Sequence, residues 1–275
     1  MSSNRPSYTV TANRSTWIER LARLGYITKG FVYGLIGVLA LMAAFGLGGQ
    51  TTDTTGALQT IATQPFGQFL LVLITIGLIG YALWRWIECI QDPEHKGSDA
   101  KGIFSRLGYA ISGLIYAGLA LTSARLVMGA ATGGGNSQQD WTAFVLAQPW
   151  GNGLVATLGA FIIGLGFYMF YKAYKTKFTQ ELDLRNLEAK KQNLLINICR
   201  LGIFARGIVF VIIGFFLIQA ARFTNPNEVK GIDGALQTLR QQPFGKFLLT
   251  LVALGLVAYG IYMAVKAIYK RIEVD

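Results

Sequence analysis

The stretch GALQTIATQPFGQFLL, residues 56–71, decides the fold, because it returns almost unchanged as GALQTLRQQPFGKFLL at residues 234–249. The two stretches are identical at 12 of 16 positions. A weaker copy of their centre, QPWG, occupies residues 148–151. Each copy stands immediately before a long apolar run, so we interpret each as part of an equivalent structural unit.

A second motif marks the beginning of the same units. Residues 23–26 and 106–109 both read RLGY, and residues 200–203 read RLGI. The distance from each arginine to the glutamine of the next QPFG-type motif is 41, 42 and 42 residues. Three correctly spaced pairs of motifs predict that the chain is one unit written three times. A further glycine follows each arginine at the same distance: Gly30, Gly113 and Gly207.

The apolar runs are long enough to cross a membrane as helices. A bilayer core about 30 Å thick needs roughly 20 apolar residues in helical form. The runs do not show the alternating pattern of a membrane β-barrel. We therefore predict an all-α polytopic membrane protein with six transmembrane helices, at about 24–46, 68–90, 108–130, 152–174, 202–222 and 246–268.

The composition agrees with a membrane protein. Hydrophobic residues make up 52% of the 275 residues, charged residues only 14%, and the mean hydropathy is +0.42. Soluble domains carry about 25% charged residues, so a water-exposed surface is not expected. High hydrophobicity excludes intrinsic disorder, and two cysteines are too few for a disulfide scaffold.

Lysine and arginine are distributed unevenly. They gather in the N-terminal tail, in the second and fourth connections and near the C-terminus, whereas residues 47–67 and 131–151 have none. Positive residues stay on the cytoplasmic side of a membrane, so we expect both termini to be cytoplasmic. This rule also accounts for most of the net charge of +11. We therefore do not expect a nucleic-acid partner.

Each repeat contains an even number of spans, so all three repeats should enter the membrane in the same orientation. Parallel repeats are related by an axis along the membrane normal, and three of them predict a pseudo-threefold bundle. The expected organisation is a cytoplasmic tail at 1–19, repeats at 20–91, 103–175 and 197–271, and a cytoplasmic amphipathic connection at 176–196.

The RLG opening, the QPFG-type motif and the threefold helix-pair repeat resemble a family of bacterial integral-membrane proteins, domain of unknown function twelve-oh-six. The resemblance runs from about Trp17 to Arg271. The second copy departs from the pattern, with Trp150 in place of phenylalanine and Asp140-Trp141 where the others have GALQ. The resemblance implies a multi-pass protein of a bacterial membrane, plasma or internal, and no assigned activity.

Charged residues within the spans are the main candidates for a functional site, since intramembrane charge is costly. They form two layers, near the cytoplasmic boundary and six residues deeper. They are candidates for binding anionic lipid headgroups. Structural pairing, such as Glu88 with Lys29 or Arg85, and an anion or solute path are the alternatives. The candidates are Arg23, Lys29, Arg106, Ser112, Arg200 and Arg206.

The QPFG-type motif is interpreted as a helix start. Proline suits the first helical turn, and an aromatic ring suits the headgroup level. The alternative is an outer vestibule lined by all three copies. The preceding acids, Asp53, Asp140 and Asp233, are interpreted as helix N-caps, and a cation-collecting ring is the alternative. The motif residues are Gln64, Pro65, Phe66, Gly67, Gln148, Pro149, Trp150, Gly151, Gln242, Pro243, Phe244 and Gly245.

Catalysis has little support. The single histidine, His95, has no partner at metal-ligand spacing, and Cys89 and Cys199 do not form a CxxC pair. We expect no catalytic residue, metal or cofactor. The preferred hypothesis is a non-enzymatic scaffold or assembly subunit that contacts lipid or a membrane-protein partner. The alternative is a small-solute or ion transporter or channel with an axial cavity between the repeats.

Overall fold

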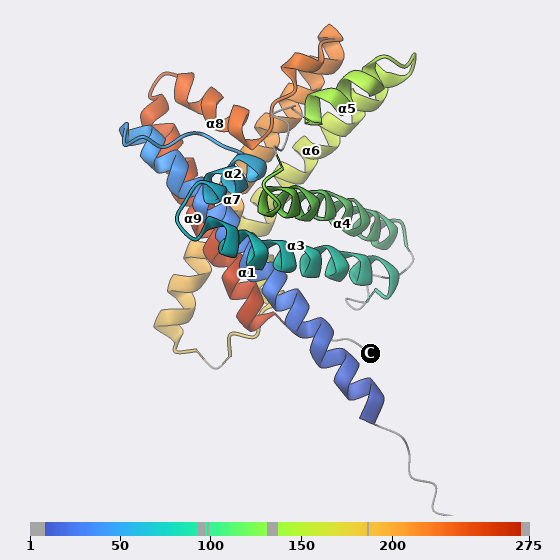
Figure 1. The fold of residues 1–275 in the computed structure, drawn as a ribbon, viewed down its shortest axis with the longest axis vertical. Coiled ribbons are helices and arrows are strands. Elements are labelled where there is room, and N and C mark those ends of the chain that lie inside the picture. The colour runs from blue at the N-terminus through green and yellow to red at the C-terminus, as the bar shows by residue number, and fades with distance from the viewer. Residues whose placement is uncertain (1–8, 93–96, 98, 131–136, 186, 271–275) are drawn as a thin grey trace, which may run out of the picture.

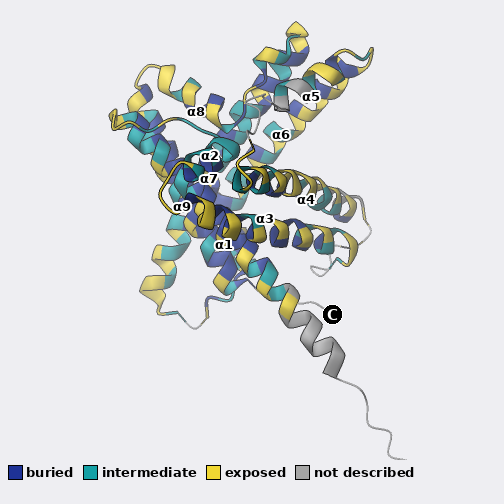
Figure 2. Ribbon diagram, viewed as in Figure 1, coloured by how far each residue is buried: buried dark blue, intermediate teal, exposed yellow. Residues whose placement is uncertain are grey.

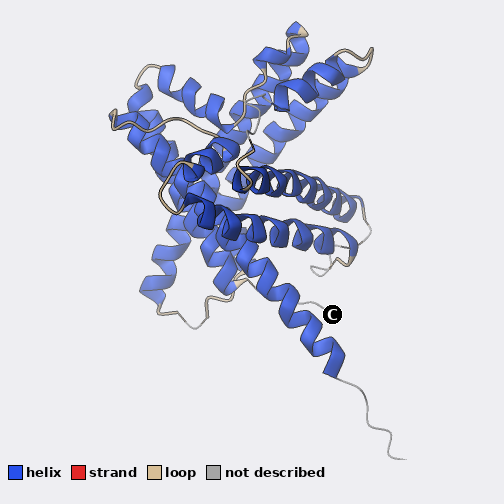
Figure 3. Ribbon diagram, in the orientation of Figure 1, coloured by secondary structure: helices blue, strands red, loops and turns tan. Residues whose placement is uncertain are grey.

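The computed structural model describes residues 9–92, 97, 99–130, 137–185 and 187–270. Throughout these residues the regular secondary structure is helical (Figures 1 and 3). The prediction of an all-α protein is confirmed. The long helices are α1 (Thr9–Phe45), α3 (Gly67–Ile90), α4 (Ala100–Val127), α6 (Gly151–Tyr174), α7 (Ala189–Phe223) and α9 (Gly245–Tyr269). The short ones are α2 (Thr54–Ala62), α5 (Ser137–Leu146), α8 (Ile232–Gln241), η1 (Lys177–Glu181) and η2 (Pro226–Glu228).

Each long helix contains a segment that is long and apolar enough to cross a membrane. The predicted spans agree with these segments to within a few residues at most ends. The largest differences are at α1 and α7, which begin at Thr9 and Ala189, well before their apolar runs. The protein is therefore a multi-pass membrane protein built from helix pairs.

The fourth connection differs from its prediction. It is not one amphipathic helix on the membrane surface, since the short η1 ends at Glu181 and the residues from Ala189 onward belong to α7. Phe178 and Leu182 are buried in the helix bundle. These two apolar side chains anchor the connection to the core.

The tightest helix pairs join one repeat to the next. The second helix of each repeat packs beside the first helix of the following one, as α3 with α4 and α6 with α7, and α9 closes back onto α1 (Figure 1). Helix α1 also packs on α3, and α7 on α9, whereas α4 and α6 form no comparable pair among the described helices. The pairing recurs three times, and full pseudo-threefold symmetry stays a prediction.

Glycines at equivalent positions allow these close approaches. A Cβ atom on Gly30 would lie 2.7 Å from the carbonyl oxygen of Gly260, and one on Gly207 would lie 3.0 Å from that of Gly166. Gly113 faces Ala82 and Trp86 in the corresponding α4–α3 contact. Small residues at such crossings let membrane helices pack backbone to backbone. Buried residues gather where α1, α3, α7 and α9 meet (Figure 2).

The QPFG-type motif forms a turn in all three copies, and α3, α6 and α9 each begin at its glycine. Phe66 and Phe244 adopt the left-handed conformation with φ +61° and +62°, whereas Trp150 has φ −96°. The glycine N–H donates to the carbonyl of the motif glutamine at 2.8–2.9 Å. Pro65 lies in the turn before α3, so the expected place in the first helical turn is wrong. The aromatic side chains are largely exposed, as an interface anchor requires, and the shared vestibule stays a prediction.

The predicted acidic caps are only partly correct. The Asp53 carboxylate accepts the Gly56 N–H at 2.8 Å and caps α2. Asp233 lies inside the first turn of α8, whose cap residue is Gly231, so its predicted capping role is wrong. Asp140 lies within α5, which begins at Ser137. A cap must stand just before the first turn, and these two acids stand too late in the sequence.

Candidate functional site

Two of the three RLG arginines bind the last carbonyls of the helix that packs beside them. Arg23 donates to the carbonyl of Ala267 and, at 2.8 Å, to that of Ile268, at the end of α9. Arg106 donates to the carbonyls of Cys89 and Ile90 at the end of α3, at 2.7 and 3.2 Å. The last carbonyls of a helix have no partner within it and carry partial negative charge, so an arginine there is favourable. The structure thus gives two of the six candidates a capping role.

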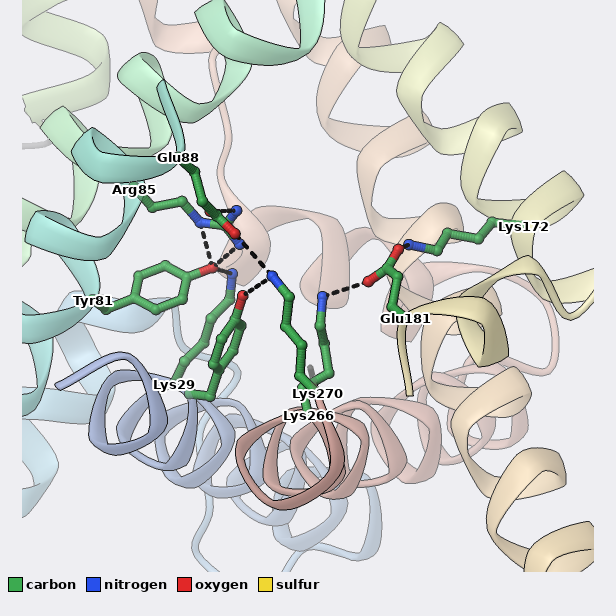
Figure 4. A network of polar contacts seen from close by, with 9 residues as sticks. Lys29, Tyr81, Arg85, Glu88, Lys172, Glu181, Lys266 and Lys270 are labelled. Carbon is green, nitrogen blue, oxygen red and sulfur yellow. Dashed lines mark hydrogen bonds and ion pairs between the residues drawn. The ribbon is translucent and has the colours of Figure 1, made fainter. Parts of the chain in front are cut away.

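A buried network of charged and tyrosine side chains lies one layer deeper (Figure 4). Glu88, whose side chain is fully buried, pairs with Arg85 at 2.6 Å and with Lys270 at 2.8 Å. Lys270 also donates to the Tyr26 hydroxyl at 3.0 Å, and Arg85 donates to that of Tyr81. The predicted Arg85–Glu88 pair is confirmed. The alternative pairing of Glu88 with Lys29 does not form, because Lys270 reaches the carboxylate instead.

Glu181 joins the other two lysines of this layer. Its carboxylate accepts Lys172 of α6 at 2.6 Å and Lys266 of α9 at 2.8 Å. Figure 4 shows Lys266 and Lys270 side by side on one face of α9, with Lys270 reaching Glu88 and Lys266 reaching Glu181. Burial alone would raise the pKa of Glu181, but attraction to Lys266 and Lys172 outweighs it and holds the pKa well below its ordinary value of 4.5.

Replacing Glu181 with glutamine is expected to destabilise the protein at neutral pH by about 2 kcal/mol, because two lysines lose their counter-ion. The pKa of Glu181 is lower in the folded state, so its contribution is complete above pH 4.5 and declines as the pH falls further. Melting of both proteins in detergent at pH 7 and in steps below pH 4.5 measures this. Glu188→Gln, whose side chain is 73% exposed, is the control. An unchanged melting temperature at pH 7 would contradict the bridging role.

Lys29 and Arg206 lie in a cage of four tyrosines. The ammonium of Lys29 sits 4.8 Å from the ring centre of Tyr81 and 4.7 Å from that of Tyr116. The guanidinium of Arg206 sits 4.8 Å from the ring centre of Tyr33 and 4.5 Å from that of Tyr259. We call these six residues the tyrosine cage. They come from α1, α3, α4, α7 and α9, so the cage occupies the place where the repeats meet.

The two cations of the cage have few acceptors. Lys29 donates to the Tyr81 hydroxyl at 3.0 Å. The Nε and Nη1 atoms of Arg206 are buried and have no hydrogen-bond partner among the residues that the structure describes. Neither cation forms an ion pair with a carboxylate in those residues. A buried charged donor without an acceptor is costly, and such a group in a native protein calls for a water or an ion.

The two remaining candidate residues, Ser112 and Arg200, lie outside both the charged network and the tyrosine cage. Ser112, at the repeat position equivalent to Lys29 and Arg206, is half-buried on α4, one turn before Tyr116. Arg200 lines a cavity between α6 and α7 and does not cap α6. No group of three His, Cys, Asp or Glu side chains stands close enough to hold a metal ion in the described part of the chain. His95 lies outside that part.

The repeat seen in the structure coincides with a known sequence family. Residues 24–91, 107–176 and 201–270 each match the family described as Domain of Unknown Function (DUF1206). The chain belongs to the DUF1206 family. The resemblance noted from the RLG and QPFG-type motifs is thereby confirmed, with the same number of repeats.

A relative agrees with this assignment over almost the whole chain. The uncharacterized protein YxxB of Bacillus subtilis (strain 168) is 42% identical over 255 residues, which cover 93% of this chain and 92% of the relative. No solved structure matches. The DUF1206 repeats therefore define the architecture of this chain.

Several residues of the DUF1206 core escaped prediction. Lys270 and Glu181 lie at the margins of the spans, and their partners Glu88 and Lys266 are 182 and 85 residues away in the sequence. The tyrosines carried a usable signal: Tyr33 and Tyr116 each follow the deep-layer position of their repeat by four residues, and Tyr81 and Tyr259 occupy equivalent sites on the second helices. Polar aromatic residues repeated at the depth of a cation indicate a shared cation site.

Proposed function

We propose that the protein is a membrane transporter or channel for a small anion, which binds in the tyrosine cage beside Lys29 and Arg206. The single observation that carries this is the guanidinium of Arg206, which has two buried donors without an acceptor among the residues that the structure describes. Aromatic rings lie within 5 Å of the guanidinium carbon, and an anion beside the guanidinium would accept the N–H groups of Nε and Nη1.

Electrostatics supports an anion in preference to a cation or neutral solute. Lys29 and Arg206 place two basic side chains in the apolar bundle, with no carboxylate paired to either among the described residues. Such charges are costly in a membrane unless they are compensated, and they mark ion pathways in many membrane proteins. Ser112, at the equivalent position of the second repeat, would add a hydroxyl donor at the same depth.

The proposal is tested by flux into proteoliposomes. The purified protein is expected to conduct at least one of chloride, nitrate, bicarbonate or acetate, and the double variant Lys29→Ala with Arg206→Ala should lose about tenfold or more of that flux. Removing two charge-assisted contacts has at least this effect on affinity. Arg240→Gln, an exposed arginine on α8, is the matched control and should keep its flux. Absence of anion flux in the parent protein, or equal flux in the double variant, would refute the proposal.

A second candidate is a scaffold or assembly subunit for a membrane complex. It is favoured by α4 and α6, in which only 22% and 17% of the apolar segment is buried, against 61% for α9. Large apolar side chains such as Leu114 and Leu158 face outward on these helices. Native mass spectrometry of the protein extracted mildly from its own membrane tests this candidate, which requires a stoichiometric partner protein. Neither candidate is an enzyme.

The proposed location is a bacterial membrane with both ends cytoplasmic. The hydrogen bonds from Arg23 to Ala267 and Ile268 bring the beginning of the first span beside the end of the last. The basic connections lie at the same end of the repeats, which the positive-inside rule makes cytoplasmic. A cysteine introduced near either terminus should resist impermeant thiol reagents in intact cells, and labelling there would contradict this orientation.

A further inference from the structure

The third RLG arginine behaves differently from the first two. Arg23 and Arg106 donate to the carbonyls that end α9 and α3. The repeat places Ala173 and Tyr174, at the end of α6, in the equivalent positions for Arg200. Arg200 makes no hydrogen bond or ion pair with them or with any other described residue. The geometry that the first two copies share is thus absent from the third, and Arg200 has no polar partner in the part of the chain that the structure describes.

The end of α6 offers one of the equivalent carbonyls a backbone partner. After Tyr174 the chain turns at Thr176, which adopts the left-handed conformation with φ +49°, as Asp92 does after α3 with φ +48°. The Thr176 N–H donates to the Ala173 carbonyl at 3.3 Å. Ala173 corresponds to Cys89, whose carbonyl accepts from Arg106. One of the two carbonyls equivalent to those that Arg106 binds is thus satisfied within α6.

A cavity of about 630 Å³ lies where Arg200 points between α6 and α7. Its wall is mostly apolar and aromatic, with Phe170, Leu201 and Phe204, and Tyr171 and Tyr174 complete the end nearest to the basic connection. Lys175 and Lys177 stand over the rings of Tyr174 and Tyr171, at 5.7 and 4.6 Å from the ring centres. The cavity thus has apolar walls, an arginine and two lysines at its rim.

We infer that this cavity binds an anionic phospholipid, with the headgroup phosphate on Arg200 and the start of an acyl chain along Phe170 and Phe204. Three features fit this ligand together. The arginine offers paired N–H donors in the geometry that phosphate accepts. The lysines at the rim add attraction for the negative charge of the inner leaflet. The apolar wall on Leu201 and Phe204, which are 41% and 47% exposed, is open to lipid tails. The site is separate from the tyrosine cage and does not depend on anion transport.

The experiment is native mass spectrometry of the detergent-purified full chain, titrated with phosphatidylglycerol and, in parallel, with phosphatidylcholine. The parent protein should retain phosphatidylglycerol preferentially. Arg200→Gln should weaken that binding about tenfold, because one charge-assisted phosphate contact is lost. Arg222→Gln is the matched control, since it removes an exposed arginine from the other end of the same helix and should leave binding unchanged.

Two further arms keep the result decisive. Leu201→Trp fills the apolar wall without altering charge and should also weaken lipid binding, so the inference stays testable if Arg200→Gln does not fold. Inorganic phosphate in excess should not displace the lipid. Equal retention of the two lipids by the parent, or unchanged binding in both Arg200→Gln and Leu201→Trp, would overturn the inference. Full displacement by inorganic phosphate would also overturn it and reassign the cavity to a soluble anion.

Discussion

Replacing Glu88 with glutamine is expected to be among the most damaging single substitutions in this protein, with a loss of about 3–5 kcal/mol in the free energy of unfolding. The Glu88 side chain is fully buried and neutralises both Arg85 and Lys270, whose side chains are only 14% and 3% exposed. The neutral amide would remove the carboxylate that Arg85 and Lys270 share. The hydrogen bonds from Arg85 to the Tyr81 hydroxyl and from Lys270 to the Tyr26 hydroxyl would stay, but neither hydroxyl carries a negative charge.

Unfolding in a graded series of denaturing detergent measures this loss. Glu188→Gln provides the control, because its pair with Lys191 is exposed and should contribute less than about 1 kcal/mol. The double variant Glu88→Leu with Lys270→Met should recover part of the stability, since it removes one buried charge of each sign together. A Glu88→Gln protein as stable as the Glu188→Gln protein would show that the network does not hold the bundle together.

The second large effect is expected from a single methyl group on α1. In Gly30→Ala, the new Cβ would lie 2.7 Å from the Gly260 carbonyl oxygen, closer than any ordinary contact. Because the obstacle is backbone, α1 and α9 would have to move apart, at a cost of about 1–3 kcal/mol. This helix pair joins the third repeat to the first, so a wider spacing of α1 and α9 weakens the contact between these two repeats.

Gly34→Ala is the matched control on the same helix, one turn away. A Cβ there meets nothing within 4 Å, and alanine is about 1 kcal/mol better than glycine in a helix interior, so this variant should be neutral or more stable. Gly207→Ala, in the equivalent α7–α6 contact, should behave like Gly30→Ala. Equal melting temperatures for Gly30→Ala and Gly34→Ala would contradict the close crossing of α1 and α9.

Much of the architecture could be predicted because it depends on local or repeated patterns. The apolar runs define the helices, and the three spaced motifs define the units. The hydrogen-bond partners of the motif residues were less predictable, because these partners lie on other helices. Arg23 and Arg106 resemble interfacial arginines in sequence, yet they cap helices of another repeat, 16–17 residues away in one case and 244–245 in the other.

The candidate site was predictable only in outline. The deep cations Lys29 and Arg206 stood out because charge is rare inside a span. The tyrosines around them could not be predicted, because they come from helices of different repeats that become neighbours only in the fold. Glu181 illustrates the limit of sequence reasoning. It lies in a basic connection that is predicted to be cytoplasmic and amphipathic. In the structure Phe178 anchors that connection in the core, and the Glu181 carboxylate reaches Lys172 and Lys266.

The central claim is that Arg206 holds a small anion within the tyrosine cage. A crystal structure grown in bromide, with data collected at the bromine absorption edge, tests it most directly. We predict an anomalous peak within hydrogen-bond distance of Nε or Nη1 of Arg206 in the parent protein, and none in the Arg206→Gln variant. Protein groups or water on both guanidinium nitrogens, with no bromide in the cage, would contradict the claim.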